Sequence, residues 1–256
     1  MLPESVHVRV VSPITTKGFR RVEDLEALGG AGLIVSGSQI DEGPGSIECE
    51  FEAAMSVPDT IRKIVEAERE GADAVVIDCM GDPGLRPARE MVRIPVVGPC
   101  QAAMHVAAML GHRFSVVTVL RRLRSQFENA AAVYGLAGQM ASVRHVDIPV
   151  LELEKDLNAT TAALIEQGKL AVEADGAEAI IFGCTGLLGC ASAVKEGLAA
   201  LGIDIPVIDP IPNAVNVAAS LVRSGLTQSA LTYPAPPAKE LVGYPALKAA
   251  LPIAAE

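Results

Sequence analysis

An internal repeat is the feature of this sequence that most restricts its fold. The segment EGADAVVIDCMGDPG, residues 70–84, aligns with DGAEAIIFGCTGLLG, residues 175–189. The match resumes further on, where IPVVGPCQAAMHVAAML, residues 94–110, aligns with IPVIDPIPNAVNVAASL, residues 205–221. Repeated segments of this length predict two halves of similar structure, related by a pseudo-twofold axis.

Short apolar runs alternate with helical patterns along the chain. Runs rich in Val and Ile that are apolar almost throughout are typical of strands buried on both faces, as in parallel sheets. A helical pattern that starts near Pro58 and Asp59 ends at Gly71, and a longer one over 158–176 has Asn158 or Thr160 as its expected cap. The alternation predicts an α/β fold with mainly parallel sheets. The expected strands lie in residues 7–12, 72–78, 94–98, 113–119, 177–183 and 204–209.

The repeat places one cysteine in each half. Cys79 aligns with Cys184, and each follows an expected strand and precedes a glycine-containing turn. Ligands of open α/β sheets bind beyond the carboxyl ends of the strands, so we expect the two thiols to face one cleft from opposite sides. The remaining cysteines have no counterpart in the other half and are interpreted as small buried apolar residues. They are Cys49, Cys100 and Cys190.

Two facing thiols suit a racemisation. One sulfur, as thiolate, removes a proton from a stereocentre, and the other, as thiol, delivers a proton to the opposite face. Exposed backbone N–H groups at a strand-to-helix turn favour an anion, and glycine lets the backbone approach a ligand closely. The same N–H groups can stabilise an enolate oxygen as its charge develops. Cys79 and Cys184 are therefore the predicted catalytic residues.

Composition limits the partners and the compartment. The chain has 256 residues, of which 50% are hydrophobic. Its formal net charge is −10, and this negative charge argues against nucleic acid and anionic membrane surfaces as partners. We see no signal peptide at the N-terminus, and the longest uncharged stretch, residues 94–111, contains prolines and is not read as a membrane span. A cytoplasmic location with free thiols is expected. The cysteine spacing includes no CxxC pair, so no structural metal site is predicted.

Several segments carry a resemblance to a known family. They are CMGDPGL at 79–85, GCTG at 183–186, GPGSIECEFEAA at 43–54, HRFSVVTVLRR at 112–122 and VDIPVLELE at 146–154. On these segments the chain resembles the hydantoin and allantoin racemases of the aspartate/glutamate racemase superfamily. The resemblance covers nearly the whole chain, and the first cysteine motif is its most specific part.

The resemblance implies a fold and an assembly. It implies two pseudo-symmetric flavodoxin-like halves with parallel sheets and an active site in the cleft between them. Because members of the family exchange segments between halves, the first half is expected over 1–98 plus about 206–232, the second over 99–205, and a C-terminal tail over 233–256. Members of the family need no metal and no organic cofactor. The resemblance also implies that the protein is a homo-oligomer.

The resemblance also implies an activity and a set of substrate contacts. Family members racemise 5-substituted hydantoins or allantoin through two cysteine acid/bases, which map onto Cys79 and Cys184. Where the family often has Asn-Pro-Asn after the first strand, this chain has Ser12-Pro13-Ile14-Thr15, a difference expected to alter the pocket. The expected substrate contacts are the backbone N–H groups of Gly81, Asp82, Thr185 and Gly186, the side chain of Thr118, and the loops that hold Ile14 and Gly45.

Two alternatives stay open from the sequence. One keeps the fold and changes the reaction to that of an aspartate or glutamate racemase, a maleate isomerase or a malonate decarboxylase. The other is a small-metabolite binding protein or a thiol redox sensor, which requires the Cα atoms of Cys79 and Cys184 to lie within about 7 Å. The first motif favours a neutral ring over a free amino acid. For three further residues we expect structural rather than catalytic roles by default. They are His105, Asp78 and Glu48.

Overall fold

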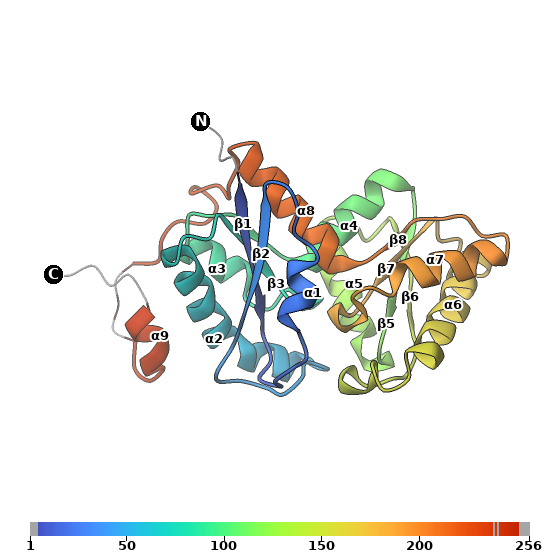
Figure 1. Ribbon diagram of the computed structural model, residues 1–256, viewed down its shortest axis with the longest axis horizontal. Coiled ribbons are helices and arrows are strands. Elements are labelled where there is room, and N and C mark those ends of the chain that lie inside the picture. The colour runs from blue at the N-terminus through green and yellow to red at the C-terminus, as the bar shows by residue number, and fades with distance from the viewer. Residues whose placement is uncertain (1–4, 238, 240, 251–256) are drawn as a thin grey trace.

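The protein consists of two lobes, each built on a four-stranded parallel sheet (Figure 1). The computed structural model describes residues 5–237, 239 and 241–250. The first sheet has the order β2-β1-β3-β4 and the second the order β6-β5-β7-β8, so the two sheets have equivalent topologies. The predicted α/β class with two pseudo-symmetric halves is confirmed. The strands are β1 Val6–Ser12, β2 Leu33–Gln39, β3 Ala74–Ile77, β4 Val96–Val97, β5 Phe114–Thr118, β6 Met140–His145, β7 Ala179–Phe182 and β8 Val207–Ile208.

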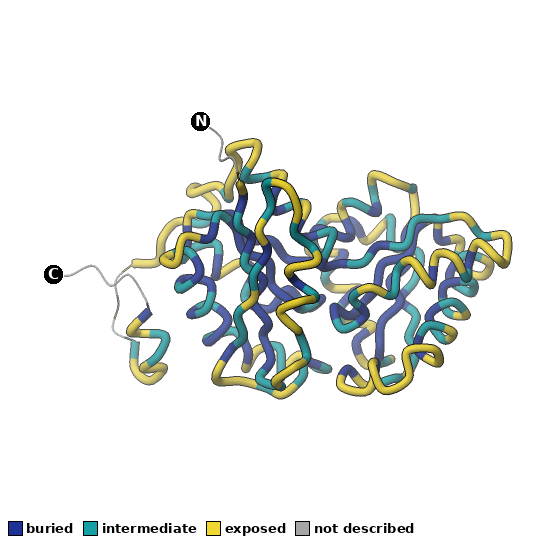
Figure 2. The backbone as a smooth tube through the Cα atoms, viewed as in Figure 1, coloured by how far each residue is buried: buried dark blue, intermediate teal, exposed yellow. Residues whose placement is uncertain are grey.

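Helices flank both sheets and leave the strands in the interior of each lobe (Figure 2). The α-helices are α1 Val22–Glu26, α2 Glu50–Arg69, α3 Leu85–Met91, α4 Pro99–Leu110, α5 Arg124–Val133, α6 Leu157–Glu173, α7 Ala191–Ala200, α8 Pro210–Arg223 and α9 Pro245–Ala250. Three 3₁₀ turns join them: η1 Arg121–Leu123, η2 Val150–Glu152 and η3 Thr185–Leu187. Within the described ranges, no helix has both the length and the apolar character needed to cross a membrane.

The central strands follow from their sequences. All four residues of β3 and all four of β7 are buried, as expected for apolar strands covered on both faces. The edge strands β2 and β6 were not predicted. Their sequences, LIVSGSQ and MASVRH, lack a continuous apolar run because both strands are partly exposed at a sheet edge.

The two halves exchange one helix each. Helix α4 follows β4 of the first sheet but packs on β5 and β7 of the second, and α8 follows β8 of the second sheet but packs on β1, β3 and β4 of the first. Strand β8 pairs with β7, so the chain returns to the first half after Ile208, slightly later than the predicted position 206. We otherwise keep the predicted boundaries of the two halves as a proposal.

Two helix starts differ from the prediction. Helix α2 begins at Glu50 and contains Pro58, because the carboxylate of Glu52 accepts the N–H of Glu48 at 2.6 Å and starts the helix earlier. Helix α6 is capped by Asp156, whose carboxylate accepts the N–H of Ala159, and not by Asn158 or Thr160.

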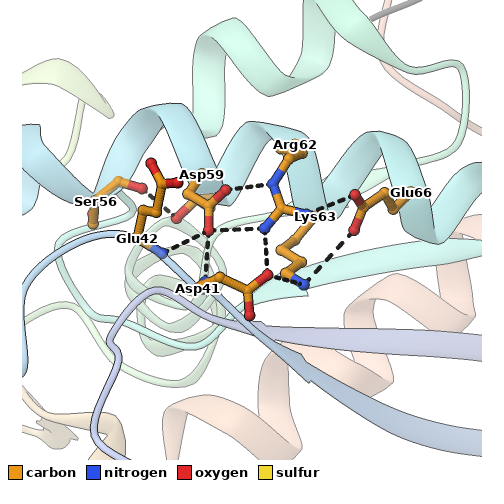
Figure 3. A network of polar contacts seen from close by, with 8 residues as sticks. Asp41, Glu42, Ser56, Asp59, Arg62, Lys63 and Glu66 are labelled. Atoms are coloured by element: carbon orange, nitrogen blue, oxygen red, sulfur yellow. Dashed lines mark hydrogen bonds and ion pairs between the residues drawn. The ribbon is translucent and has the colours of Figure 1, made fainter. Parts of the chain in front are cut away.

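An ion network centred on the buried Arg62 holds the loop before α2 against that helix (Figure 3). Arg62 pairs with Asp59 and Glu66 of its own helix and with Asp41 of the loop, at 2.6 Å from Nη2 to Oδ2 for the last. The Asp59 carboxylate also accepts the backbone N–H groups of Asp41 and Glu42. This network fixes the start of the loop whose far end reaches the cleft between the halves.

The end of the chain returns to the first half. Helix α9 packs on α2 of the same chain, at one side of the molecule (Figure 1). The predicted tail over 233–256 is therefore in part a helix, while residues 238, 240 and 251–256 of that tail lie outside the described residues.

Candidate active site

The two repeated cysteines occupy equivalent turns. Cys79 follows β3 and Cys184 follows β7, and both are free thiols. The N–H of Gly81 donates to the Cys79 sulfur, and the N–H of Gly186 donates to the Cys184 sulfur, each with 3.4 Å between nitrogen and sulfur. Each turn thus aims a backbone donor at its own sulfur, which stabilises a thiolate there.

Both sulfurs line one cavity between the halves. Its volume is about 40 Å³, which holds only a few water molecules. Its walls are mainly apolar and come from both lobes: Ile14, Phe19 and Ile47 from the first, and Leu123, Phe127 and Val150 from the second. The cavity is thus narrow, and its surroundings are largely apolar.

Burial dominates the acidity of both thiols. It raises the pKa of Cys79 to about 12, against the opposing effect of the Gly81 N–H. It raises the pKa of Cys184 also to about 12, against the Gly186 N–H and the nearby guanidinium of Arg20. The charges of Asp82 and Asp78 raise the pKa of Cys79 further. Asp78 also raises the pKa of Cys184, which offsets the effect of Arg20, so the two thiols have similarly raised pKa values.

Arg20 links the two cysteine turns and was missed from the sequence. Its guanidinium donates to both carboxylate oxygens of Asp78 at 2.9 Å and to the carbonyl oxygen of Thr185 at 2.7 Å. In return, the Thr185 hydroxyl donates to the carbonyl oxygen of Asp78 at 3.1 Å. The Arg20 and Asp78 side chains are 8% and 0% exposed, so this ion pair is buried. The pair lies within the first half, and the hydrogen bonds of Arg20 and Asp78 with Thr185 join it to the second half.

Five of the nine predicted site residues line the cavity. Ile14, Gly81 and Thr185 line it together with the two cysteines. Gly186 lies beside the Cys184 sulfur, and a Cβ atom on it would come within 3.1 Å of the Phe19 ring.

Three predicted contacts lie elsewhere. The Asp82 N–H donates to Cys79 O, and the Asp82 carboxylate accepts the N–H groups of Cys100 and Gln101 and the Tyr134 hydroxyl. Asp82 therefore fixes the start of α4 and does not line the cavity. The Thr118 hydroxyl donates to Gly183 O, and Gly45 offers its carbonyl oxygen to the Thr16 hydroxyl. Thr118 and Gly45 support the cavity walls from behind.

Two loops of the first half are joined at the cavity. The Thr15 N–H donates to Pro44 O at 2.9 Å, which holds the loop of Ile14 to the loop of Ile47. Glu48 then crosses to the second half, where its carboxylate accepts the Val150 N–H at 2.8 Å. The default structural interpretation of Glu48 from the sequence agrees with this contact.

The Gln126 side chain also lines the cavity and was missed from the sequence. It lies on α5 of the second half, where nothing in the repeat draws attention to it. His105, which the sequence suggested only as a helix histidine, is exposed and contacts the carbonyl oxygen of Gln101. In the part of the chain that the structure describes, no three His, Cys, Asp or Glu side chains are grouped as metal ligands would be.

Comparisons with known proteins agree with this geometry. The family model for Asp/Glu/Hydantoin racemase matches residues 11–218. The chain is 37% identical to a hydantoin racemase of Pseudomonas sp. (strain NS671), over 92% of this chain and 94% of that protein. It is 36% identical to a hydantoin racemase of Rhizobium meliloti, over 93% of this chain and 98% of that one.

A solved structure has the same architecture. An allantoin racemase from Klebsiella pneumoniae superimposes with a TM-score of 0.89 at 32% identity and covers 97% of this chain and 100% of its own. Together these comparisons confirm the family resemblance that the cysteine motifs predicted from the sequence.

Proposed function

Because the chain belongs to the Asp/Glu/Hydantoin racemase family, we propose that it racemises 5-substituted hydantoins or allantoin through Cys79 and Cys184. The observation that carries this proposal is the pair of equivalent thiols, each with a glycine N–H on its sulfur, that line one cavity between the halves. The family comparisons confirm the enzyme class, which is that of a racemase and thus an isomerase.

The proposed reaction moves one proton off the ring and another onto it. The thiolate of one cysteine removes the proton from C5, and the electron pair of the C5–H bond forms the enolate of the neighbouring carbonyl. The thiol of the other cysteine then protonates C5 on the opposite face and becomes the thiolate. The second enantiomer reacts with the two roles exchanged. Before a new turnover in the same direction, the two sulfurs exchange protons with solvent.

The cavity wall supports a neutral ring over a free amino acid. Aspartate and glutamate carry two carboxylates and an ammonium group, which need charged partners once they leave water. Among the described residues that line the cavity there is no Lys or Arg, and Arg20 behind it is already paired with Asp78. The apolar side chains around the cavity further favour an alkyl or aryl substituent at C5.

The deciding experiment is proton NMR in D₂O on single enantiomers, with circular dichroism in parallel. The panel is a 5-alkylhydantoin, allantoin, aspartate and glutamate. Loss of the C5–H signal together with decay of the optical signal for the ring compounds supports the proposal. Exchange without optical decay would mean that only one base works. Turnover of aspartate or glutamate alone would overturn the ring assignment in favour of the amino-acid alternative.

We propose in addition that the enzyme works in the cytoplasm as a homo-oligomer without metal or organic cofactor. Light scattering of the purified protein tests the assembly, since a monomeric mass would contradict it. Full activity after extensive dialysis against a chelator tests the absence of a metal.

A further inference from the structure

The two glycines that follow the cysteines are each covered by a side chain from the opposite half. A Cβ atom added to Gly81 would lie 2.6 Å from Nε2 of Gln126, which belongs to α5 of the second half. A Cβ atom added to Gly186 would lie 3.1 Å from the ring of Phe19, which belongs to the first half. One sulfur turn therefore faces a carboxamide and the other faces an aromatic ring.

Gln126 has an unused hydrogen-bonding group at the cavity. Its Oε1 is shielded from solvent and has no hydrogen-bond partner within the described part of the chain. Gln126 lines the cavity, and its Nε2 lies close to the Cys79 turn. Buried polar atoms of native proteins are nearly always paired, and an unpaired one beside a cavity fits a partner that a ligand supplies once the amide turns toward it.

The chemistry of a carboxamide identifies that partner. A carboxamide presents one donor and one acceptor side by side, and a rotation of its terminal bond exchanges their positions. A cyclic ureide presents the complementary pair where its N3–H group adjoins the C4 carbonyl. A carboxylate offers acceptors only and an ammonium offers donors only, so neither matches both atoms of the amide.

We propose that Gln126 is a catalytic and specificity-determining residue that holds the N3–H and C4 carbonyl edge of a hydantoin-type ring. Its Oε1 accepts the N3–H, and its Nε2 donates to the C4 oxygen. The C4 oxygen carries the negative charge once C5 loses its proton, so this donor becomes stronger as the enolate forms. The inference rests on the proposed function and assigns to it a residue of the second half.

The placement also shows what a side chain at position 81 would displace. With any larger residue at 81 the Gln126 amide would have to withdraw from its place beside the sulfur. Gly81 thus serves both the sulfur, through its N–H, and the ring, by leaving room for the amide.

The test compares a hydantoin that has a free N3–H with its N3-methyl derivative. The variants are Gln126→Met, which keeps the length and removes both polar atoms, and Gln126→Leu as a second replacement if the first does not fold. Gln139→Met is the matched control, since Gln139 also has a buried Oε1 without a partner among the described residues but does not line the cavity.

We expect wild-type kcat/KM to favour the N3–H compound by about 10- to 100-fold, because N3-methylation leaves the amide unpaired. In Gln126→Met this preference falls to within about threefold, and kcat for the N3–H compound falls about 10- to 100-fold, as for loss of one donor to a developing oxyanion. Gln139→Met keeps the wild-type preference and kcat. Any intrinsic difference between the two compounds cancels in the comparison of enzymes.

The possible results distinguish failure of the proposed function from failure of the role assigned to Gln126. If the wild type racemises neither ring compound, the proposed function fails, and this inference fails with it. If the wild type racemises them and Gln126→Met keeps both the preference and kcat, only the role of Gln126 is overturned. If Gln139→Met loses the preference as strongly as Gln126→Met, the effect is one of folding, and the assignment is likewise overturned.

Discussion

The two cysteine turns have the same backbone and different side chains. Each follows a fully buried central strand and directs a glycine N–H at its sulfur over 3.4 Å. The residues around the two turns are not equivalent. The residue before Cys79 is an aspartate paired with Arg20, and the residue before Cys184 is a glycine. The repeat therefore specifies where two equivalent thiols stand, and the residues outside the repeat distinguish one side of the cavity from the other.

The same contrast appears three positions after each cysteine. Asp82 lies on the buried side of its turn and accepts three hydrogen bonds that hold α4 in place. Its counterpart Leu187 is a fully buried apolar residue. One half uses this position to orient the exchanged helix, and the other uses it to fill its core.

The largest expected effect comes from removing one thiol at a time. We expect Cys79→Ala and Cys184→Ala each to lower racemisation by at least about 10³-fold, since an acid or base in the transition state contributes on this scale. Each variant keeps one base, so it should exchange C5–H with D₂O in only one enantiomer. The enantiomer should differ between the two variants. NMR on separated enantiomers measures this, and full racemisation by either variant would contradict the two-base assignment.

The second prediction concerns the Arg20–Asp78 ion pair, which has no counterpart at the Cys184 turn. Arg20→Met leaves the buried carboxylate of Asp78 without its partner, and we expect a loss of about 3–5 kcal/mol in the free energy of unfolding. Urea unfolding followed by circular dichroism measures it. Arg124→Met is the control, because the Arg124–Glu128 pair is exposed and its loss should cost less than about 1 kcal/mol. Equal losses in both variants would show that the buried pair contributes no more to the free energy of unfolding than an exposed one.

A third prediction concerns the acidity of the sulfurs. Burial raises the pKa of both thiols, so the thiolate is scarce at neutral pH, and kcat/KM should rise by about tenfold per pH unit from 7 to 9. Thiolate absorbance near 240 nm follows the ionisation directly. Because burial is the main cause in both turns, Cys79→Ala and Cys184→Ala should gain this absorbance over the same alkaline range, near pH 12. A midpoint near the ordinary thiol value of about 8.5 in either variant would contradict the burial of the remaining sulfur.

The smallest effect compares the two glycines. Gly81→Ala and Gly186→Ala each add a methyl group against a side chain of the opposite half, with an expected cost of about 1–3 kcal/mol in the free energy of unfolding. Only Gly81→Ala displaces the Gln126 amide, so only this variant should lose the preference for a free N3–H. Kinetics on the paired hydantoins measure the difference. A similar loss in both variants would mean that the two turns contact the ring alike.

The sequence alone predicted the symmetric part of the site and missed the asymmetric part. Cys79, Cys184, Gly81 and Gly186 were found because the repeat aligns them and because strand ends point to a cleft. Arg20 and Gln126 have no such signal. Each lies in a segment outside the aligned repeat and reaches the site only through the contact between the halves.

Local sequence patterns also do not show which hydrogen-bonding groups are already paired within the protein. The expected contact at Asp82 is its backbone N–H, but that N–H donates to Cys79 O, and the Asp82 carboxylate accepts N–H groups at the start of α4. Thr118 ends a predicted strand, but its hydroxyl is used by Gly183 O. Sequence periodicity places a residue at a strand end and does not give its rotamer.

The exchanged helices have a mechanical consequence. The chain crosses between the halves twice, between β4 and α4 and between β8 and α8, and each crossing leads into a proline at the first position of the helix. Helices α4 and α8 pack on each other, so the two crossings form adjacent, stiff straps. The two lobes are therefore joined by two neighbouring connections, and the cavity that both cysteines line lies between the lobes that these connections hold together.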